Sequence, residues 1–417
     1  MDLTSIALLV GGEGWGLLES LPPYDASGEL ALQTRLRSAG FSPEVVSAAL
    51  TQSRLRARGR DKFGTFADGM LFTPDGLEQA TRLEVAARHA SRYLRAEVRA
   101  VHDLGCGIGA DAMALAGLDL AVRAVDSDEV TAVAAGVNLR HWPEAQVVHG
   151  RAEDVALPRG EATRHTGLWL DPSRRVRGAA DITGRTRRVF SLDAISPTWE
   201  QVQDYARAVP ASGAKLSPAF PHQAIPPGAE AAWTSWNGEV VECALWWGPL
   251  VQSAGRTATV CRAGQPAVTL TEADAECSPD LLDGLDGLGS YVYEADRAVI
   301  RAGLSGALAR AVDGAELDRG VGYVSSDRPL DVAWAHRYSI VEAMPWNVKA
   351  LRAWLRDNDI GRLTIKKRGV ALDPEAVRRQ LRVKGSADLT LILTRVRSQP
   401  HVLLVRPEGP RPSVHHV

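Results

Sequence analysis

One segment rich in glycine, VHDLGCGIGAD, carries the residues whose types and spacing are best suited to chemistry. A predicted strand ends at Asp103, and Gly105, Gly107 and Gly109 follow before an alanine-rich helix. Glycine lets the backbone turn sharply and lets a ligand approach it where a Cβ would intrude. Twenty-three residues after Asp103, a second predicted strand ends in Asp126, whose carboxylate is placed to accept hydrogen bonds from both hydroxyls of a ribose. This order predicts a cofactor that contains a ribose, and a tight turn with a solvated aspartate is the structural alternative.

The same segment resembles a known family. DLGCGIGAD followed by AVDSD is similar to the first two motifs of the class I S-adenosylmethionine-dependent methyltransferases. The resemblance implies that the cofactor is S-adenosylmethionine, with its amino-acid end against the glycine loop and its ribose on Asp126. It also implies an adenine contact for Asp154, in GRAEDVAL after the third predicted strand, where a helix N-cap is the alternative. The residues expected around the cofactor are Asp103, Gly105, Cys106, Gly107, Gly109, Asp126, Ser127, Asp154, Phe72 and Thr73.

The fourth predicted strand ends in a candidate catalytic group, Asp171-Pro172-Ser173-Arg174. Ligands of open α/β sheets lie beyond the carboxyl ends of the strands, so Asp171 should face the transferred methyl group. The tetrapeptide resembles the [D/N/S]-P-P-[aromatic] motif of methyltransferases that act on the amino groups of nucleic-acid bases. In that motif the first side chain and the following backbone carbonyl accept hydrogen bonds from the amine.

The tetrapeptide departs from that motif at two positions, because Ser173 replaces the second proline and Arg174 replaces the aromatic residue that stacks on the base. Another aromatic residue, the Arg174 guanidinium, or a substrate that is not a base would each explain the difference. The aromatic candidates are Trp169, Phe190 and Phe66. The structural alternative for Asp171-Pro172 is a turn that ends the strand.

Two clusters of basic residues are predicted to contact phosphates, and a solvated charged surface is the alternative for each. The first follows Asp171 and comprises Arg174, Arg175, Arg177, Arg185, Arg187 and Arg188. The second lies between Lys349 and Arg397, where thirteen Lys and Arg accompany five acids. Its central residues are Lys366, Lys367 and Arg368. The whole chain has a formal charge of −2, which excludes general affinity for nucleic acid and favours a local docking patch.

The apolar pattern predicts a helical domain at 1–97, a sheet domain at 98–284, a mixed α+β domain at 285–407 and a disordered tail at 408–417. In the sheet domain, short strands alternate with helices, which indicates a parallel sheet. The strands are expected at 98–104, 121–126, 145–149, 167–171 and 212–217. Asn237-Gly238 between two β-rich runs predicts a closing hairpin, and residues 249–290 are expected to be loop-like. The fold class is therefore α/β, with a seven-stranded sheet between a helical domain and an α+β domain, and the resemblance implies that this sheet is the Rossmann-like sheet of the methyltransferases.

The C-terminal domain is expected to have three helices and five strands. The helices are predicted at 295–313, 347–357 and 374–383, and the strands at 321–325, 336–343, 361–366, 388–396 and 401–406. The pieces YVYEADRAVIRAG, LTIKKRGVALDP and LTLILTRV resemble bacterial methyltransferases with a THUMP-like C-terminal domain, which are distantly similar to trimethylguanosine synthases. The resemblance implies that this domain binds RNA, an inference from fold analogy.

The segment ahead of the sheet adds to the same resemblance through LFT at 71–73 and LEQAT at 77–81. By that likeness Phe72, Thr73, Gln79 and Thr81 would help to close over the cofactor, and for Gln79 and Thr81 an exposed helix position is the alternative.

Composition limits the remaining possibilities. The 417 residues are 45% hydrophobic and 24% charged, as in soluble globular proteins, and they suffice for two or three domains. The four cysteines are scattered without metal spacing, so neither zinc nor a disulfide framework is expected, and no apolar run is long enough to cross a membrane.

We therefore expect a cytoplasmic enzyme that methylates a base amine, guanine N2 or adenine N6, in structured RNA. The alternatives are a small-molecule or protein methyltransferase, and a non-catalytic RNA-binding protein with a relic fold.

Overall fold

The computed structural model describes residues 1–173, 192–276 and 279–408, and these form two compact units. Unit 1 comprises Met1–Leu216 and Leu245–Gln252, and unit 2 comprises Ser217–Ala244 and Ser253–Val417. The predicted domain boundaries at residues 97 and 284 each fall inside one of these units, and they stay predictions.

Unit 1 begins with helices whose ends follow from local sequence signals. The Ser42 side chain caps α4 by accepting a hydrogen bond from the Val45 N–H, and Pro43 occupies the first helical position. Thr73 and Pro74 begin α5 in the same way. The helices are α1 (Leu3–Val10), α2 (Gly12–Ser20), α3 (Glu29–Ser38), α4 (Pro43–Phe63), α5 (Pro74–Gln79) and α6 (Leu83–Arg95).

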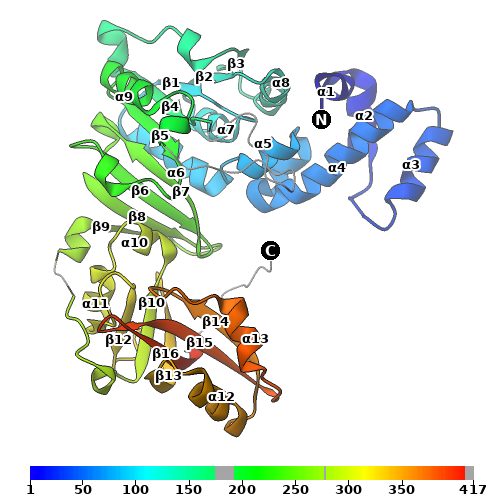
Figure 1. Ribbon diagram of the computed structural model, residues 1–417. Coiled ribbons are helices and arrows are strands. Elements are labelled where there is room, and N and C mark those ends of the chain that lie inside the picture. The colour runs from blue at the N-terminus through cyan, green and yellow to red at the C-terminus, as the bar shows by residue number, and fades with distance from the viewer. Residues whose placement is uncertain (174–191, 277–278, 409–417) are drawn as a thin grey trace. The chain divides into compact units, whose positions relative to one another are not determined.

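The rest of unit 1 is a parallel sheet with helices between its strands (Figure 1). Its strands run in the order β3-β2-β1-β4-β5, so the first strand lies in the middle and its carboxyl end is flanked by the ends of β2 and β4. The strands are β1 (Ala100–Leu104), β2 (Ala121–Asp126), β3 (Ala145–His149), β4 (Thr166–Leu170) and β5 (Ser212–Leu216). The helices are α7 (Ala110–Ala116), α8 (Glu129–Asn138) and α9 (Trp199–Ala208). The prediction of a Rossmann-like sheet is confirmed.

The predicted hairpin is present as β6 (Glu230–Trp236) and β7 (Glu239–Trp246), joined at Asn237 and Gly238. Both turn residues have positive φ, 48° and 87°, as a type I′ turn requires. The hydrogen-bonded order continues from β5 as β7-β6-β8-β9, which gives nine strands in place of the predicted seven.

The two additional strands are β8 (Gly255–Cys261) and β9 (Val268–Thr271), so the expectation of a loop at 249–290 is wrong for these residues. The β8 strand contains polar threonines, and Thr257 is buried with its hydroxyl donating to Glu230. Its strand character therefore depends on pairing with β6 and β9, which a local pattern does not reveal.

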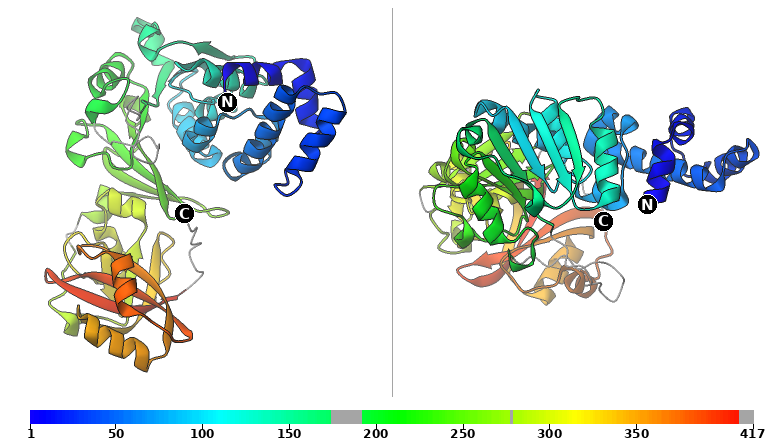
Figure 2. Two further views of the ribbon diagram at one scale, coloured as in Figure 1. Left: turned by 45° about the vertical axis from the view of Figure 1, so that its right-hand side comes forward. Right: turned by 90° about the horizontal axis from the view of Figure 1, so that it is seen from above.

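The C-terminal part of unit 2 is a mixed sheet in the order β11-β12-β10-β13-β16-β15-β14. Its strands are β10 (Tyr291–Ala295), β11 (Ala315–Glu316), β12 (Tyr323–Ser326), β13 (Ala335–Pro345), β14 (Ile360–Lys367), β15 (Ala387–Val396) and β16 (Gln399–Glu408). The last strand, β16, pairs with both β13 and β15, and Figure 2 shows these C-terminal strands in orange to red within the sheet.

Four helices accompany this sheet: α10 (Arg297–Arg301), α11 (Gly306–Val312), α12 (Val348–Asp357) and α13 (Pro374–Leu381). The single helix predicted at 295–313 is two helices, because the chain turns at Gly303 with a φ of 71°. Helices α12 and α13 bury Leu351, Leu355, Val377 and Leu381 in one core with β14, β15 and β16. The strand β10 was not predicted.

Candidate active site

The glycine loop after β1 adopts backbone angles that glycine tolerates and other residues rarely do. Gly105, Gly107 and Gly109 have φ values of 91°, 57° and 86°, in the left-handed region that favours glycine. A Cβ on Gly105 would lie 2.6 Å from the backbone oxygen of Asp171, so only glycine fits between this loop and the end of β4. No atom lies within 4 Å of the Cβ position of Gly107. The loop therefore presents bare backbone, as the sequence analysis expects of a cofactor loop.

Asp126, at the end of β2, is tied to this loop. Its Oδ2 accepts a hydrogen bond from the Gly107 N–H at 2.9 Å, and its Oδ1 accepts one from the Asp128 N–H at 2.9 Å. Burial raises the pKa of Asp126 above its usual value. The next residue, Ser127, is exposed, and Cys106 is buried beside the loop. The first two predicted cofactor motifs therefore meet at the carboxyl edge of the sheet.

Asp103 is the most unusual group at this edge. Its side chain is buried, and neither carboxylate oxygen has a hydrogen-bond partner among the described residues. Burial raises its pKa well above the usual value, and the nearby charges of Asp111 and Asp171 raise it further. A buried carboxylate without a donor is costly unless a cation or donor of a ligand completes it. The ammonium group of S-adenosylmethionine is such a donor, so the residues present fit this cofactor.

A buried pair that the sequence analysis missed lies behind the glycine loop. Asp111, in the first turn of α7, accepts a hydrogen bond from the Thr81 hydroxyl at 2.7 Å, and its Oδ1 lies 2.8 Å from His89 Nδ1. Burial opposes ionisation of Asp111, but His89, Lys215 and the Thr81 hydroxyl together outweigh it and lower the pKa of Asp111. The His89 ring packs against Trp169 and Trp246, with ring centroids 4.5 Å and 5.5 Å away. Thr81 is therefore buried and bonded, not an exposed helix position.

The candidate catalytic loop begins where β4 ends. The Asp171 N–H donates to the Leu104 carbonyl at 3.1 Å, which fixes this loop to the end of β1. Ser173 and Ser196 exchange backbone hydrogen bonds of 2.8 Å and 3.2 Å. The Asp171 carboxylate forms an ion pair with Lys215 of β5, a residue that the sequence analysis did not single out, with 2.6 Å between Oδ2 and Nζ.

The remaining predicted residues of this loop lie outside the described residues. These are Arg174, Arg175, Arg177, Arg185, Arg187, Arg188 and Phe190. Of the other stacking candidates, Trp169 is 1% exposed and stacks on Trp246, so it cannot stack on a base. Phe66 is exposed.

Two further predicted cofactor residues have clear structural roles. The Phe72 ring is completely buried against Phe63 and the backbone of Gly59, in the hydrophobic core of unit 1. Thr73 is also buried, and its hydroxyl caps α5 by accepting from the Gly76 N–H at 3.0 Å. We therefore do not assign a direct cofactor contact to the Phe72 side chain.

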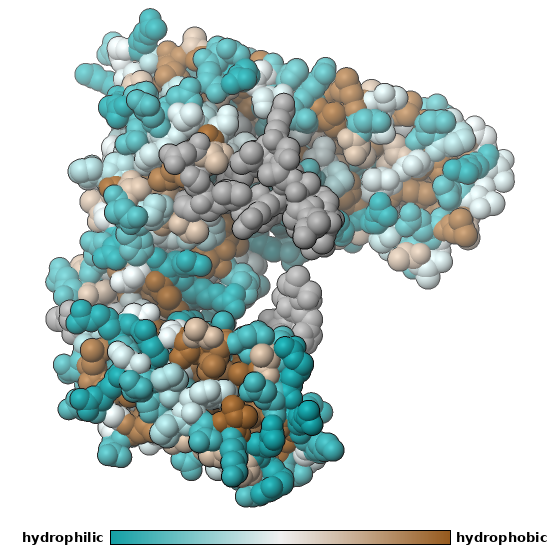
Figure 3. Space-filling view, in the orientation of Figure 1, coloured by the Kyte–Doolittle hydropathy of each residue, from teal (hydrophilic) through white to brown (hydrophobic). Residues whose placement is uncertain are grey.

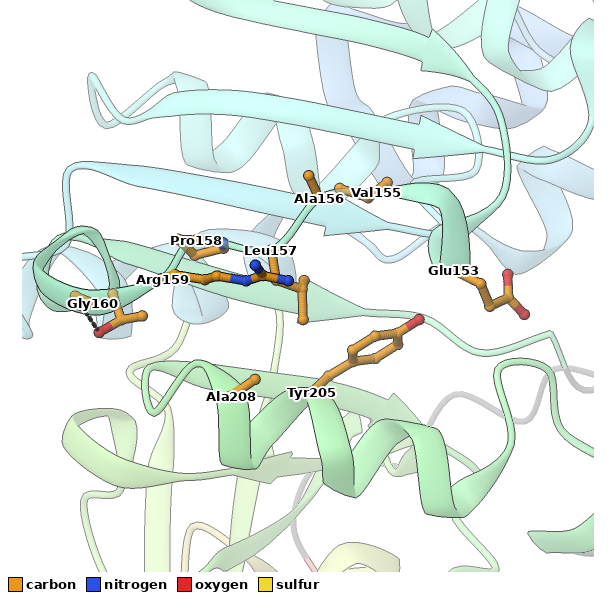
Figure 4. Close-up of a pocket in the computed structure, with 10 residues that line it drawn as sticks. Glu153, Val155, Ala156, Leu157, Pro158, Arg159, Gly160, Tyr205 and Ala208 are labelled. Carbon is orange, nitrogen blue, oxygen red and sulfur yellow. Dashed lines mark hydrogen bonds between the residues drawn. The ribbon is translucent and has the colours of Figure 1, made fainter.

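Asp154 is exposed, on the short turn Ala152–Asp154 after β3. A pocket of about 480 Å³ opens beside it, between the chain segment 153–163 and helix α9 (Figure 4). The Tyr205 hydroxyl points toward the Glu153 end of this pocket, and the segment from Val155 to Pro158 forms its apolar wall. The adenine contact predicted for Asp154 stays a prediction.

The basic residues predicted in unit 2 are divided between two environments. Lys366 and Arg368 form ion pairs with Glu294, with N···O distances of 2.6 Å and 3.1 Å. Burial opposes ionisation of Glu294, but these two cations outweigh it and lower its pKa. Glu294 belongs to β10 and Lys366 to β14, which three strands separate, so the sheet must curl for them to meet. Lys367, by contrast, is exposed.

Among residues 1–173, 192–276 and 279–408, no group of three or more His, Cys, Asp or Glu is arranged to hold a metal ion. Over the same ranges, no helix combines the length and apolarity needed to cross a membrane.

Comparison with known proteins agrees with the site. Over 373 residues, the chain is 32% identical to an uncharacterised S-adenosylmethionine-dependent methyltransferase of Mycobacterium tuberculosis, covering 87% of this chain and 95% of that protein. Residues 335–407 match the family model described as THUMP domain-like, and residues 2–59 match a domain of unknown function, DUF8688.

A crystal structure from Porphyromonas gingivalis W83, provisionally named a methyltransferase, shares the fold with a TM-score of 0.67 at 19% identity. The match covers 93% of this chain and all of that one. The chain belongs to the S-adenosylmethionine-dependent methyltransferases, as a member with a THUMP-like domain near its C-terminal end.

Proposed function

We propose that this enzyme methylates an exocyclic amine of a base, guanine N2 or adenine N6, in structured RNA. The observation that supports the amine acceptor most directly is the position of Asp171. Its backbone is bonded to the end of β1, its carbonyl oxygen faces Gly105 of the cofactor loop, and its carboxylate lies at the carboxyl edge of the sheet. A group held there is suited to accept hydrogen bonds from an amine that approaches the cofactor.

The proposed chemistry is mostly a matter of position. S-adenosylmethionine supplies an electrophilic methyl group on a sulfonium. The Asp171 carboxylate and the backbone carbonyl that follows it accept hydrogen bonds from the acceptor amine, which orients the nitrogen lone pair for in-line attack. The N–C bond forms as the S–C bond breaks, and the nitrogen then loses one proton to Asp171 or to water. In this proposal Pro172 and Ser173 shape the loop around the amine. Arg174, which lies outside the described residues, is a candidate for stacking on the base through its guanidinium.

Two features support RNA as the carrier of the base. The THUMP-like match covers the basic part of unit 2, and the acids of that part are already engaged. Asp357, Glu375 and Asp388 pair with arginines, Asp373 caps α13, and Asp359 bonds to Ser386. Cations that form no ion pair with an acid in the described structure therefore remain, and phosphates are their natural partners. Between residues 349 and 397 they are Lys349, Arg352, Lys367, Arg379, Arg382, Lys384 and Arg397.

Lys349, Arg352 and Arg379 lie on helices α12 and α13, Arg382 and Lys384 directly follow α13, and Lys367 lies on β14. The Arg352 guanidinium donates to the Gln380 carbonyl, which brings the basic residues of α12 next to Arg379 and Arg382 at the end of α13. Figure 3 shows hydrophilic residues gathered over this edge of unit 2. We call Lys349, Arg352, Arg379, Arg382 and Lys384 the helical basic surface and propose it as the RNA contact. Lys366 and Arg368 are engaged by Glu294 and serve this role less well.

The proposal also includes a role for the arginines near the reacting site and a location for the protein. The arginines that follow the catalytic loop, Arg174, Arg175, Arg177, Arg187 and Arg188, would hold phosphates near the reacting base. A cytoplasmic location also follows, because an RNA substrate and free cysteines suit the reducing compartment in which RNA is modified.

A second candidate is a methyltransferase for a small molecule or a protein. One observation favours it: Trp169 is buried, so the motif residues that the structure describes offer no ring to stack on a base. Its activity would survive treatment of the substrate fraction with nuclease.

The test is transfer of a labelled methyl group from S-adenosylmethionine to unmodified RNA, with Asp171→Ala as the control. Label that is sensitive to nuclease and absent in the variant supports the proposal. Cofactor binding without label in any RNA would remove RNA as the substrate, and label in a protein or metabolite fraction would support the second candidate.

A further inference from the structure

Lys215, at the end of β5, connects three segments of unit 1 through its ammonium group. Nζ donates to Asp171 Oδ2 at 2.6 Å, to the Thr81 hydroxyl at 3.1 Å and to the Gln79 carbonyl at 3.4 Å. The residue is only 7% exposed. An ammonium has three N–H donors, and these three acceptors match that number. Its position is therefore defined by the candidate catalytic loop on one side and by the end of α5 on the other.

The segment that Lys215 contacts also touches the cofactor loop. A Cβ on Gly76 of α5 would lie 2.4 Å from Cγ2 of Ile108, so α5 packs directly on the glycine loop. Thr81 bonds to Asp111 of α7 as well as to Lys215. A continuous chain of polar contacts therefore runs from Asp171 through Lys215 and Thr81 to Asp111 and His89.

We propose that Lys215 is a positioning residue for methyl transfer, which fixes the Asp171 carboxylate toward the acceptor and locks residues 79–81 over the cofactor loop as one unit. The proposal rests on the role of Asp171 in the proposed function.

The charges around Lys215 explain why a cation is needed at this position. Asp103, Asp111 and Asp171 lie close enough for their charges to interact, and Lys215 opposes the pKa increase of Asp103 and helps to lower that of Asp111. A neutral side chain at 215 would leave the acids of this edge without their shared counter-charge, and the Asp171 carboxylate would lose the buried partner that orients it. Lys215 therefore holds the Asp171 carboxylate in place.

Lys62 offers a natural comparison, because it holds the same segment without touching Asp171. Its Nζ donates to the carbonyls of Leu77, Glu78 and Ala80 at 2.9, 2.7 and 2.8 Å. Burial, with the nearby charge of Lys215, lowers the pKa of Lys62 to about 8. Loss of Lys62 should loosen residues 77–80, whereas loss of Lys215 should loosen residues 79–81 and also release Asp171.

The experiment compares Lys215→Met, Lys215→Arg and Lys62→Met in the full chain. Methionine has nearly the length of lysine without its donors, so the fold should tolerate it, and circular dichroism with S-adenosylhomocysteine binding checks this. We expect Lys215→Met to reduce kcat about 100-fold, as for a reacting group that is misplaced by about 1 Å, with a much smaller change in KM. Lys215→Arg should recover a large part of kcat, and Lys62→Met should mainly weaken cofactor binding.

A second measurement does not depend on the identity of the substrate. Amide hydrogen exchange of residues 79–82, with S-adenosylmethionine bound, should accelerate at least tenfold in Lys215→Met and remain near the wild-type rate in Lys215→Arg. If Lys215→Met leaves both kcat and this exchange unchanged, the proposal is wrong. If no acceptor is methylated by the wild type, the proposed function fails, and unchanged exchange would still count separately against the locking role of Lys215.

Discussion

Gly105 and Asp171 are in direct backbone contact: a Cβ on Gly105 would lie 2.6 Å from the carbonyl oxygen of Asp171. This contact joins the cofactor loop to the candidate catalytic loop at one point. Any larger residue at 105 must displace the backbone of Asp171, because a Cβ is fixed to its own backbone and the atom it would meet is a backbone oxygen.

The first prediction follows from this contact. Gly105→Ala should weaken S-adenosylmethionine binding by at least about tenfold and lower the melting temperature, because it adds both the clash and the strain of φ near 91°. Titration calorimetry and thermal unfolding measure the two effects. Gly107→Ala is the matched control, since φ is 57° there but no atom lies within 4 Å of the new Cβ. Equal destabilisation of the two cofactor-free variants would contradict the role of the Asp171 contact.

The second prediction concerns pH. The pKa of Asp103 is raised in the folded protein, so the folded chain keeps a proton that the unfolded chain releases above its ordinary pKa of about 4. The stability of the cofactor-free protein should therefore fall as pH rises from about 4 through the raised pKa. Thermal unfolding across this range should show the fall in the wild type and a flatter profile in Asp103→Asn.

The same carboxylate predicts the response to the cofactor. A bound ammonium favours ionised Asp103, so the affinity for S-adenosylmethionine should rise with pH over that range, and Asp103→Asn should bind it at least about tenfold more weakly. Calorimetry at several pH values measures this. An Asn variant with wild-type affinity and an unchanged pH profile would exclude a contact between Asp103 and the cofactor.

The third prediction concerns the ion pairs of unit 2. Glu294→Gln leaves Lys366 and Arg368 without their carboxylate in a site where the three side chains are 11–28% exposed. We expect a loss of about 3 kcal/mol in the stability of this sheet, as for a buried pair that is broken on one side. Denaturant-dependent hydrogen exchange of β10 and β14 reports it. Glu316→Gln is the control, because Glu316 is equally buried but accepts a backbone N–H from Gly322, which an amide oxygen also does.

The fourth prediction tests the helical basic surface. The double change Arg379→Glu and Arg382→Glu should weaken binding of structured RNA by at least about tenfold. It should also reduce the slope of log binding constant against log salt concentration by the equivalent of about two phosphate contacts. The double change Arg356→Glu and Arg362→Glu reverses the same number of exposed charges, but those arginines already pair with Asp357 and Asp388. Fluorescence anisotropy over a range of salt concentrations compares them. If both variants lose the same affinity, RNA does not dock specifically on α12 and α13.

The elements that local sequence encodes were predictable. The five parallel strands match their predicted ranges within two residues, and Asn237-Gly238 forms the expected hairpin turn. The glycine loop and Asp126 were also recognisable, because a sharp turn followed by an acid at a strand end has few structural alternatives. The strands β8 and β9 could not be predicted, because a run such as RTATVC becomes a strand only through pairing with its neighbours in the sheet.

The partners within the candidate site were not predictable in the same way. Lys215 is 44 residues from Asp171, and the parallel pairing of β4 with β5 brings the two together. Thr81, 134 residues from Lys215, reaches it from the segment between α5 and α6. His89 and Asp111 meet in the same manner. In unit 2, the run of basic residues around Lys366 indicated a charged surface, but Glu294, 72 residues away, engages two of its three members. Residue types at one position give no sign of a partner so distant in sequence.

The interior position of β16 has a consequence for the order in which the protein is made. The strands β13 and β15 emerge from the ribosome before β16, yet each must pair with it, so the sheet of unit 2 has a gap between β13 and β15 until residue 408 has been synthesised. Unit 1 lacks only the short return segment Leu245–Gln252 after residue 216, so it can complete its fold long before that point. We therefore expect a nascent chain of this protein to complete its cofactor fold first, and the sheet of its THUMP-like domain only when the last strand joins β13 to β15.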